Sequence, residues 1–231
     1  MKTFVTVLLA VLLFAPGAFA QEDEDWASRD YSIDDFSELY LYGGYKVFLS
    51  QGKKTALTIK SSDEDVLDNL KVNNRGDELR IEMKEDYITY RRIRVYLTFR
   101  NLEEIEVQGG LKLESDGYLD LKDLFISVEG GAKVDLQLKA DDVEVRGEGG
   151  VLVDLEGVAN SLEVRLSGAG HVDADELKTK DSHIEIEGVG TASVYATEKL
   201  FAKIDGVGKV SYKGDPKVTE DINGLGSVSK N

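Results

Sequence analysis

The strongest constraint in this sequence is a glycine phrase that recurs at nearly constant spacing. Each copy has two glycines, adjacent or one residue apart, and an apolar residue four places after the first glycine. From Gly109 onward the first glycines lie 21, 19, 19, 20, 18 and 18 residues apart. An earlier copy starts at Gly43, 66 residues before Gly109, and this distance predicts about three further periods between them. The regular copies start at Gly109, Gly130, Gly149, Gly168, Gly188, Gly206 and Gly224.

The residues that flank each phrase alternate between apolar and polar types, as in 105–107, 126–128, 134–138 and 184–186. Alternation with period two predicts strands that have one apolar face. A period near twenty that persists along the chain is typical of stacked-coil proteins. Glycine suits the bends because it adopts positive φ without strain. The sequence therefore predicts an all-β parallel β-helix with about 20 residues per coil.

Residues 1–20 have the pattern of a secretion signal. Lys2 precedes an apolar run over 4–14, and Pro16-Gly17 precedes a small-residue cleavage site at 18–20. The run is too short to span a bilayer, so no membrane insertion is expected. We expect an acidic leader and N-terminal cap over 21–36 and a single solenoid domain over 37–231, exported to the periplasm, the cell surface or the medium.

Composition narrows the possible partners. Without the signal the chain has 27 basic and 44 acidic residues, a net charge of −17. This charge disfavours nucleic acid and anionic lipid as partners. The chain has no cysteine, which excludes disulfides, thiolate metal sites and a thiol nucleophile.

The part before Gly109 is less regular. Strands are predicted over 39–42, 45–50, 55–60, 78–84 and 92–99, and a turn over 73–77. A helical turn is predicted within 63–70, with Asp63 as its cap. At the other end, the coil at 222–228 has no obvious cap, and an uncovered strand edge favours self-association or a partner.

Alignment of the coils predicts an outward acidic ladder five places after the first glycines. It is either a stripe that binds a divalent cation or a saccharide, or a solvated acidic face, and we favour the second interpretation. A ladder one place before the glycines is interpreted in the same way. No cofactor, metal ligand or catalytic residue is therefore assigned. The first ladder is Glu114, Asp135, Asp154 and Asp173, continued by Ser193, Ser211 and Ser229; the second is Gln108, Glu129, Glu148, Ser167, Glu187, Asp205 and Asn223.

An enzyme is the main alternative, because polysaccharide lyases and hydrolases also use β-helices. Arg146 and Arg165 are expected on one ladder beside Glu148 and the acidic ladder, either as part of a catalytic site or in cross-coil ion pairs. The short coils leave no long loops to build a catalytic cleft, so the non-enzymatic interpretation is favoured. His171 and His183 fall on different phases of the coil, and a metal pair is not expected.

Three aromatic residues are expected to point outward from the first coil, namely Tyr40, Tyr42 and Phe48. Outward rings on a terminal coil could stack on sugars or contact a partner. The favoured alternative is that the segment 26–36 covers them.

Residues 43–52 and 77–81, together with glycine coils such as 167–172, resemble the head GIN domain family of auto-transporter adhesins, which is common in Bacteroidetes. The resemblance extends over about residues 30–229. It implies a right-handed parallel β-helix at an exported or surface location, and it brings no functional residues. The predicted function is an exported non-enzymatic binding or structural module of the cell envelope, with a glycan or cell-surface protein as its ligand. The alternatives are a polysaccharide-active enzyme and an envelope-sensing partner protein.

Overall fold

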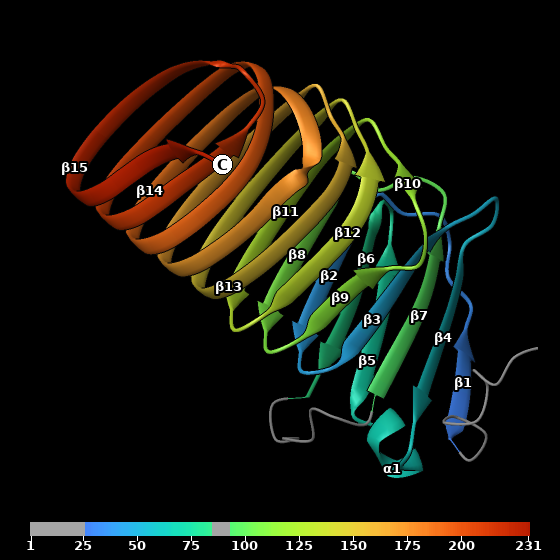
Figure 1. Cartoon of the computed structure of the whole chain (residues 1–231). Helices are drawn as coiled ribbons and strands as arrows, with labels where there is room; N and C mark the ends of the chain where they lie inside the picture. The colour runs from blue at the N-terminus through green and yellow to red at the C-terminus, as the bar shows by residue number, and fades with distance from the viewer. Residues whose placement is uncertain (1–25, 85–92) are drawn as a thin grey trace, which may run out of the picture.

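A computed structural model describes residues 26–84 and 93–231, which form a β-solenoid of about seven turns with about 19 residues per turn (Figure 1). The predicted signal over 1–20 and the acidic leader at 21–25 lie outside the described residues, whereas the predicted cap at 26–36 is described. The described strands belong to one continuous sheet that winds around an apolar axis. The prediction of an all-β parallel solenoid is confirmed.

The regular coils consist of β8 (Glu104–Gly109), β11 (Asp123–Gly130), β13 (Asp142–Val158), β14 (Ser161–Lys213) and β15 (Lys217–Lys230). β13, β14 and β15 run through the glycine bends without interruption. Successive first glycines pair directly, from Gly109 with Gly130 to Gly206 with Gly224. The coils are therefore stacked in the register that the glycine spacing predicts. The shorter strands on the far side of the bends are β9 (Lys112–Ser115), β10 (Leu119–Asp120) and β12 (Lys133–Lys139).

The N-terminal coils do not stack in chain order. β2 (Glu38–Gly43) lies between β6 (Glu78–Met83) and β8, and β3 (Lys46–Gln51) lies between β7 (Ile93–Phe99) and β9. Gly43 consequently pairs directly with Gly109. The prediction of three periods between these glycines is wrong, because the intervening chain passes to the outer side of the β2–β3 coil and returns. The number of residues between two glycines gives the number of coils between them only where the chain winds continuously in one direction.

Antiparallel strands complete this end of the solenoid. β4 (Ala56–Ser61) pairs with β7, and β1 (Ala27–Tyr31) pairs with β4 as the outermost strand of that side. On the other side, β5 (Leu70–Arg75) forms a hairpin with β6. The turn of this hairpin is at residues 76–77, shorter than the predicted turn over 73–77, because β5 extends to Arg75.

The short helix α1 (Glu64–Leu67) also lies at this end, and Asp63 caps it by accepting a hydrogen bond from the backbone N–H of Asp65. This confirms the predicted helical turn. Phe36 is buried in the core at 4% exposure. The segment 26–36 therefore packs against the N-terminal coils.

The interior is a continuous apolar column. Ile126, Val145 and Val164, which occupy equivalent positions in three successive coils, are each 0% exposed. Two polar side chains enter the interior at a corner, where Thr179 and Ser182 are 2.8 Å apart in a hydrogen bond. The Thr179 hydroxyl also donates to the Tyr195 carbonyl oxygen at 2.9 Å. These buried hydroxyls are thus satisfied, as buried polar groups must be for the fold to be stable.

The bends depend on backbone contact between neighbouring coils. Gly188 has φ of +112°, and a Cβ placed there would lie 2.7 Å from the carbonyl oxygen of Gly168 in the coil below. Neither the dihedral angle nor the spacing accommodates a side chain. Gly131 provides a contrast, since a Cβ at that position meets no atom within 4 Å and its φ is not in the left-handed region.

We expect Gly188→Ala to lower the free energy of unfolding by about 2 kcal/mol or more, because it adds backbone strain to a steric overlap. The matched control Gly131→Ala should change stability by no more than about 0.5 kcal/mol. Urea denaturation followed by circular dichroism measures both variants. Equal losses of stability would contradict the close-approach account of the bend.

Candidate functional site

Outward residues form columns along the solenoid because equivalent positions of successive coils lie next to each other. We call the strands before the bends (β2, β8, β11 and the first part of β13) the first face. The strands after the bends (β3, β9, β12 and the last part of β13) are the second face. The long strands β14 and β15 continue both faces. Three surfaces on these columns have chemistry that could serve binding.

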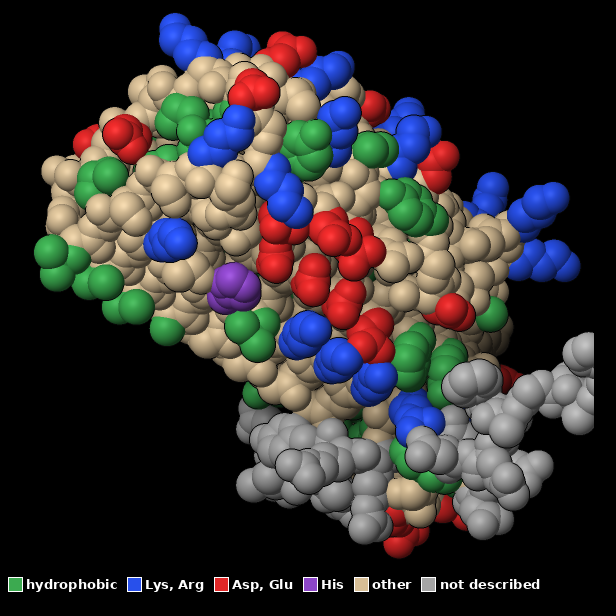
Figure 2. All heavy atoms as spheres, viewed as in Figure 1, with side chains coloured by type: hydrophobic (Ala, Val, Ile, Leu, Met, Phe, Trp, Pro, Cys, Tyr) green, Lys and Arg blue, Asp and Glu red, His purple; other side chains and the backbone are tan. Residues whose placement is uncertain are grey.

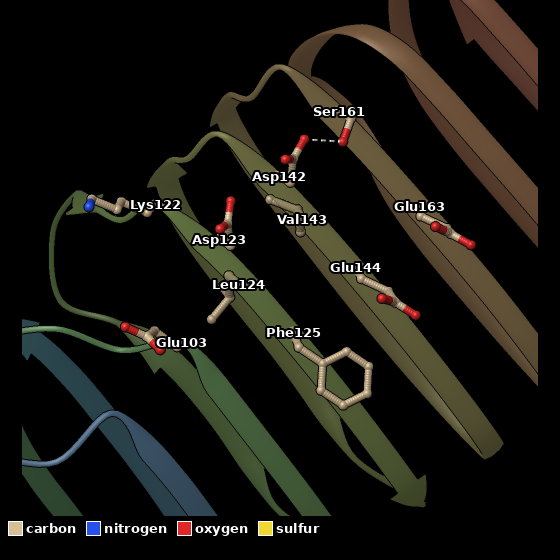
Figure 3. Close-up of a pocket in the computed structure, with 10 residues that line it drawn as sticks. All are labelled: Glu103, Lys122, Asp123, Leu124, Phe125, Asp142, Val143, Glu144, Ser161 and Glu163. Atoms are coloured by element: carbon tan, nitrogen blue, oxygen red, sulfur yellow. Dashed lines mark hydrogen bonds between the residues drawn. The ribbon is translucent and has the colours of Figure 1, made fainter. Parts of the chain in front are cut away.

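The first surface is a polar groove of about 540 Å³ on the first face, across β11, β13 and β14 (Figure 3). Its lining contains one half-buried aromatic ring, that of Phe125, and one basic side chain, that of Lys122. Carboxylates dominate the remainder. They are Glu103, Asp123, Asp142, Glu144 and Glu163.

Hydrogen bonding divides these carboxylates into occupied and free acceptors. Asp142 accepts a hydrogen bond of 2.5 Å from the Ser161 hydroxyl (Figure 3). The carboxylate of Asp123 has no hydrogen bond or ion pair in the part of the chain that the structure describes. Phe125 lies between Glu104 and Glu144 on the neighbouring strands. The groove therefore presents one open carboxylate, that of Asp123, beside the Phe125 ring. The Arg146 guanidinium lies 5.0 Å from the centroid of this ring.

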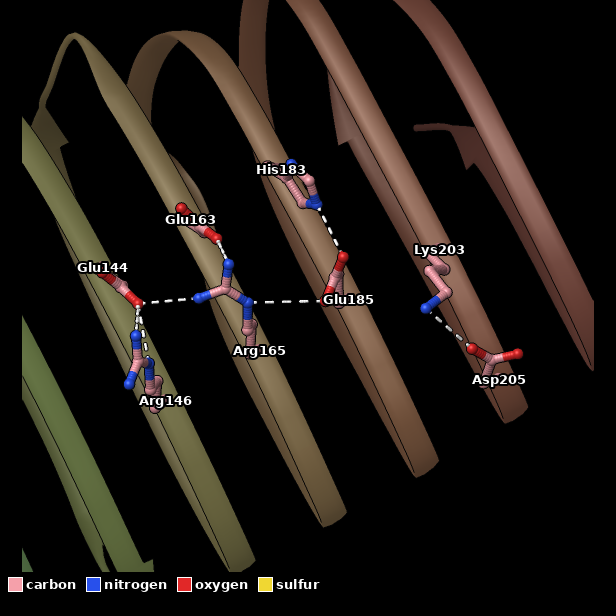
Figure 4. A network of polar contacts seen from close by, with 8 residues as sticks. All are labelled: Glu144, Arg146, Glu163, Arg165, His183, Glu185, Lys203 and Asp205. Atoms are coloured by element: carbon pink, nitrogen blue, oxygen red, sulfur yellow. Dashed lines mark hydrogen bonds and ion pairs between the residues drawn. The ribbon is translucent and has the colours of Figure 1, made fainter.

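An ion-pair network adjoins this groove (Figure 4). The guanidinium of Arg165 pairs with Glu163 in its own coil, with Glu144 in the preceding coil at 3.0 Å and with Glu185 in the following coil at 3.6 Å. Arg146 also pairs with Glu144, at 2.8 Å. Arg146 and Arg165 share one column, as predicted. Arg165 forms cross-coil ion pairs, whereas Arg146 pairs within its own coil.

The predicted position of these arginines beside the acidic ladder is wrong. Both lie on the first face, whereas Asp154 and its neighbours follow the glycine bend and lie on the second face. In the sequence the arginine column and the acidic ladder are only a few residues apart. The glycine bend between them places them on different faces of the solenoid. The structure therefore brings the arginines together with Glu148, as predicted, but not with the acidic ladder.

The second surface is the acidic ladder, which is confirmed as a continuous column on the second face. Asp135 pairs in register with Glu114 and Asp154, and Asp154 pairs with Asp173. Farther along the column, the hydroxyl oxygens of Ser193 and Ser211 are 3.0 Å apart in a hydrogen bond. Figure 2 shows acidic side chains gathered near the centre of this view, beside a line of basic side chains.

Lysines pair with Glu114 and Asp135 of this column, whereas Asp154 has no ion pair among the described residues. Burial acts to raise the pKa of Glu114, but hydrogen bonds from Lys112 and Lys46 outweigh it and hold the pKa below its ordinary value. Burial and repulsion from Asp135 and Asp173 raise the pKa of Asp154. No group of three or more metal-ligating side chains is present among the described residues. A solvated acidic face remains the better interpretation.

The third surface is an apolar groove of about 690 Å³ along the bends of β13 and β14. Its floor contains Val151, which is buried, and the second glycines Gly170, Gly190 and Gly208, which have no side chains. One wall consists of the middle residues of the phrases, including Val189 at 59% exposure and Val207 at 48%. The other wall includes Leu152, at 49% exposure, and His171.

Sequence reasoning missed this groove, although a signal was present. The middle residue of the phrase changes along the chain from glycine to progressively larger apolar residues. A surface column that becomes more apolar is unusual in a strongly acidic protein. The column is Gly150, Ala169, Val189, Val207 and Leu225.

The two histidines lie on different faces, as expected. His171 forms a hydrogen bond of 2.6 Å with the Thr191 hydroxyl on the second face. His183 is 3.1 Å from Glu185 on the first face, and its ring lies 4.5 Å from that of Phe201.

Side chains of neighbouring strands contact the outward aromatic residues of the first coil. Phe48 stacks on Tyr96 of β7 with ring centroids 5.0 Å apart, and the Arg80 guanidinium of β6 lies 4.1 Å from the Tyr40 ring. Tyr42 is 42% exposed. The rings of Phe48 and Tyr40 are therefore covered mainly by residues of β7 and β6 and not by residues 26–36, because the first coil lies inside the stack rather than at its end.

The described part of the chain contains no helix long and apolar enough to cross a membrane.

Residues 35–216 match the family described as "Putative auto-transporter adhesin, head GIN domain". The chain belongs to this family. No curated protein sequence matches the chain. The likeness of the head GIN domain to solved structures is extensive. A putative adhesin from Bacteroides fragilis superposes with a TM-score of 0.85 at 23% identity, covering 90% of this chain and 98% of that one.

Two further solved structures share the fold. A putative lipid binding protein from Parabacteroides distasonis gives a TM-score of 0.68 at 20% identity, covering 90% of this chain and 98% of that one. A putative adhesin from Parabacteroides merdae gives 0.67 at 20% identity, covering 90% and 97% of the two chains. At these identities the comparison establishes the head GIN fold alone.

The opposite pKa shifts in the acidic column lead to opposite effects of removing charge from this head GIN domain. Ionised Asp154 is destabilising above its raised pKa, so Asp154→Asn should increase stability at pH 7 by about 0.5–1 kcal/mol. Ionised Glu114 is stabilising, so Glu114→Gln should lower stability at pH 7 by a similar amount, about 0.5–1 kcal/mol.

Both differences from the wild type should disappear on acidification. The advantage of Asp154→Asn is lost as the wild-type carboxyl becomes protonated, while the deficit of Glu114→Gln vanishes as pH falls through the lowered pKa of Glu114. Urea denaturation between pH 3 and pH 8 tests this. Effects of the same sign at pH 7 would contradict the charge distribution described.

Proposed function

We propose that this head GIN domain is an exported, non-catalytic, adhesin-like binding module of the cell envelope, and that it binds a neutral glycan in the polar groove. Membership in an adhesin family supports the general role. The finer assignment depends on one observation, which is the position of Phe125 among carboxylates of four adjacent coils.

This combination suits a hydroxyl-rich ligand. Ionised carboxylates are acceptors with several lone-pair directions, so open groups such as Asp123 can receive hydrogen bonds from sugar hydroxyls. The Phe125 ring supplies a flat apolar surface against which the C–H face of a sugar can pack. The groove volume of about 540 Å³ is within the range of ordinary ligand sites.

Charge selects among glycans. The chain has a net charge of −16, and the carboxylates of the groove outnumber its single lysine. A uronic acid or sulfated polymer would be repelled on approach. Neutral oligosaccharides, or those with amino groups, are therefore the favoured ligands.

The partners of the carboxylates support binding rather than turnover. Glycoside hydrolysis needs one carboxylic acid free to protonate the leaving oxygen and a second carboxylate opposite it. In the groove, Glu144 and Glu163 both pair with Arg165, and Asp142 is bound to Ser161. These contacts occupy oxygens of all three side chains, which a catalytic acid and its partner carboxylate would need free.

A glycan array followed by calorimetric titration tests this proposal. Phe125→Ala and Asp123→Asn should each weaken binding of the best neutral oligosaccharide by about tenfold, equivalent to roughly 1.4 kcal/mol. Phe201→Ala is the matched control, since Phe201 is a half-buried ring of the same face outside the groove, and binding should not change.

Measurement of reducing-sugar release from the same array ligands distinguishes the binding module from the polysaccharide-active enzyme. We expect no release from the wild type. Equal effects of Phe125→Ala and Phe201→Ala would contradict the assigned site, and sugar release abolished by Asp142→Asn would replace the binding module with an enzyme.

The apolar groove supports a second candidate function, binding of an aliphatic chain. Its glycine floor and its walls of Leu152, Val189 and Val207 offer an elongated apolar surface of a size that suits small ligands. One protein of the same fold, from Parabacteroides distasonis, is called a putative lipid binding protein.

Titration with a fluorescent fatty-acid analogue tests this second function. We expect saturable binding that Val189→Lys weakens at least about fivefold, because a charge enters the apolar wall. The control Val158→Lys, at a residue with 43% exposure outside the groove, should leave binding unchanged. Equal responses of the two variants would refute a ligand site in this groove.

A further inference from the structure

The last coil leaves an edge of the sheet and part of the core open. β15 pairs with β14 along one edge, and its other edge has no strand partner among the described residues. Ile222 and Val228 of this coil are only partly buried, whereas Ile204 and Val210, directly beneath them, are 0% exposed. Leu225, at the bend, is 76% exposed. An open strand edge with apolar groups beside it favours pairing with another strand.

The opposite end of the solenoid is closed differently. There α1 and the antiparallel strands β1 and β5 lie at the end of the stack (Figure 1). Val66 and Leu67 of α1 are buried at 1% and 2% exposure. The outer edges of β1 and β5 also have no strand partner among the described residues, but at this end α1 buries apolar side chains that close the core. A second copy of the β15 end is the surface that matches an open apolar core.

The sequence of β15 is self-complementary about Leu225. An antiparallel pair centred on this residue places Ile222 of one copy opposite Val228 of the other, and both side chains point inward. The same register places Glu220 opposite Lys230, which have opposite charges. Facing residues of an antiparallel pair lie on the same side of the sheet, so this pairing keeps apolar with apolar and polar with polar.

The remaining positions agree with this register. Counting outward from Leu225, glycine faces glycine, Asn223 faces Ser227, and Asp221 faces Ser229. Serine hydroxyls can donate to both the carboxylate and the amide oxygen. No position brings like charges together or places a charge opposite an apolar residue between Glu220 and Lys230.

We propose that two copies of this chain associate tail to tail through the free edge of β15, with a two-fold axis at Leu225. Such an interface is isologous and closed, so it produces dimers rather than filaments. The exposed apolar column that ends at Leu225 continues from one copy into the other across the axis. Each dimer also presents its binding grooves twice, which increases avidity for a surface with repeated ligands.

The strength of association follows from the size of the interface. A single strand edge and a small apolar surface place the contact at the lower end of specific interfaces. We therefore expect a dissociation constant of about 1–100 µM. Analytical ultracentrifugation of the wild-type protein between about 5 and 300 µM covers this range, and a species that remains monomeric throughout would overturn the proposal.

Cysteine crosslinking tests the register, because the chain has no cysteine of its own. Leu225→Cys places two thiols on the axis, where facing Cα atoms are about 4.5–5.5 Å apart and within disulfide range. Val207→Cys is the matched control on the same exposed column, one coil inward. Its thiols would be about 14 Å apart across three strand spacings.

Under mild oxidation we expect Leu225→Cys to give predominantly a covalent dimer and Val207→Cys to remain monomeric. Equal crosslinking of the two variants would overturn the assigned axis. Crosslinked species larger than a dimer in the Leu225→Cys variant would overturn the closed two-fold arrangement.

A charge exchange provides a test that does not depend on thiols. Lys230→Glu should raise the dissociation constant at least about tenfold, because it places like charges opposite each other. This variant also loses the ion pair of 2.5 Å between Lys230 and Asp215, so the decisive measurement is the double variant Glu220→Lys with Lys230→Glu. Restored dimerisation in the double variant supports the register, and dimerisation that stays as weak as in the single variant overturns it.

Discussion

The whole structure depends on the approach of one backbone to the next at the glycine bends. The contact between Gly188 and Gly168 leaves no room for a side chain, and the same pairing recurs from Gly109 to Gly224. Since each bend rests on the bend below it, equivalent residues of successive coils are held in register. The apolar axis follows from that register, because inward positions then stack only on inward positions. Columns of like residues on the outside follow for the same reason.

Those columns determine what the surface can do. A solenoid repeats its chemistry at every coil, so an isolated acidic position becomes a line of carboxylates. The protein relieves the resulting repulsion differently on each face, with Arg165 bridging carboxylates of three coils and with lysines at one end of the acidic column. Binding surfaces arise where the repetition is broken. Phe125 interrupts a column of glutamates, and valines replace glycine at the bends. The proposed glycan site and the proposed tail-to-tail dimer both depend on such interruptions rather than on a pocket closed by loops.

Much of the fold and part of the surface could be predicted from the sequence. Period and alternation were sufficient for the coils, the inward residues and the acidic column of Glu114, Asp135, Asp154 and Asp173, because regular coils keep one register over many turns. Asp63 was recognisable as a cap from local chemistry alone. The polar groove around Phe125 was not predicted, since its members come from four coils and from positions that alignment treats as separate columns. The apolar groove could have been found from the middle residues of the glycine phrases.

The sequence by itself determined that the chain winds into a parallel β-solenoid and which residues face its axis, because both depend on local periodicity. Only the tertiary structure decided that Gly43 lies directly beside Gly109, since the chain between them leaves the winding and returns on the outer side. It also decided that the arginines and the acidic column lie on different faces, because the bend angle between Glu148 and Asp154 is a property of packed coils and not of spacing. Where winding is regular, distance along the chain converts to position in space; where it reverses or bends, packing alone sets the arrangement.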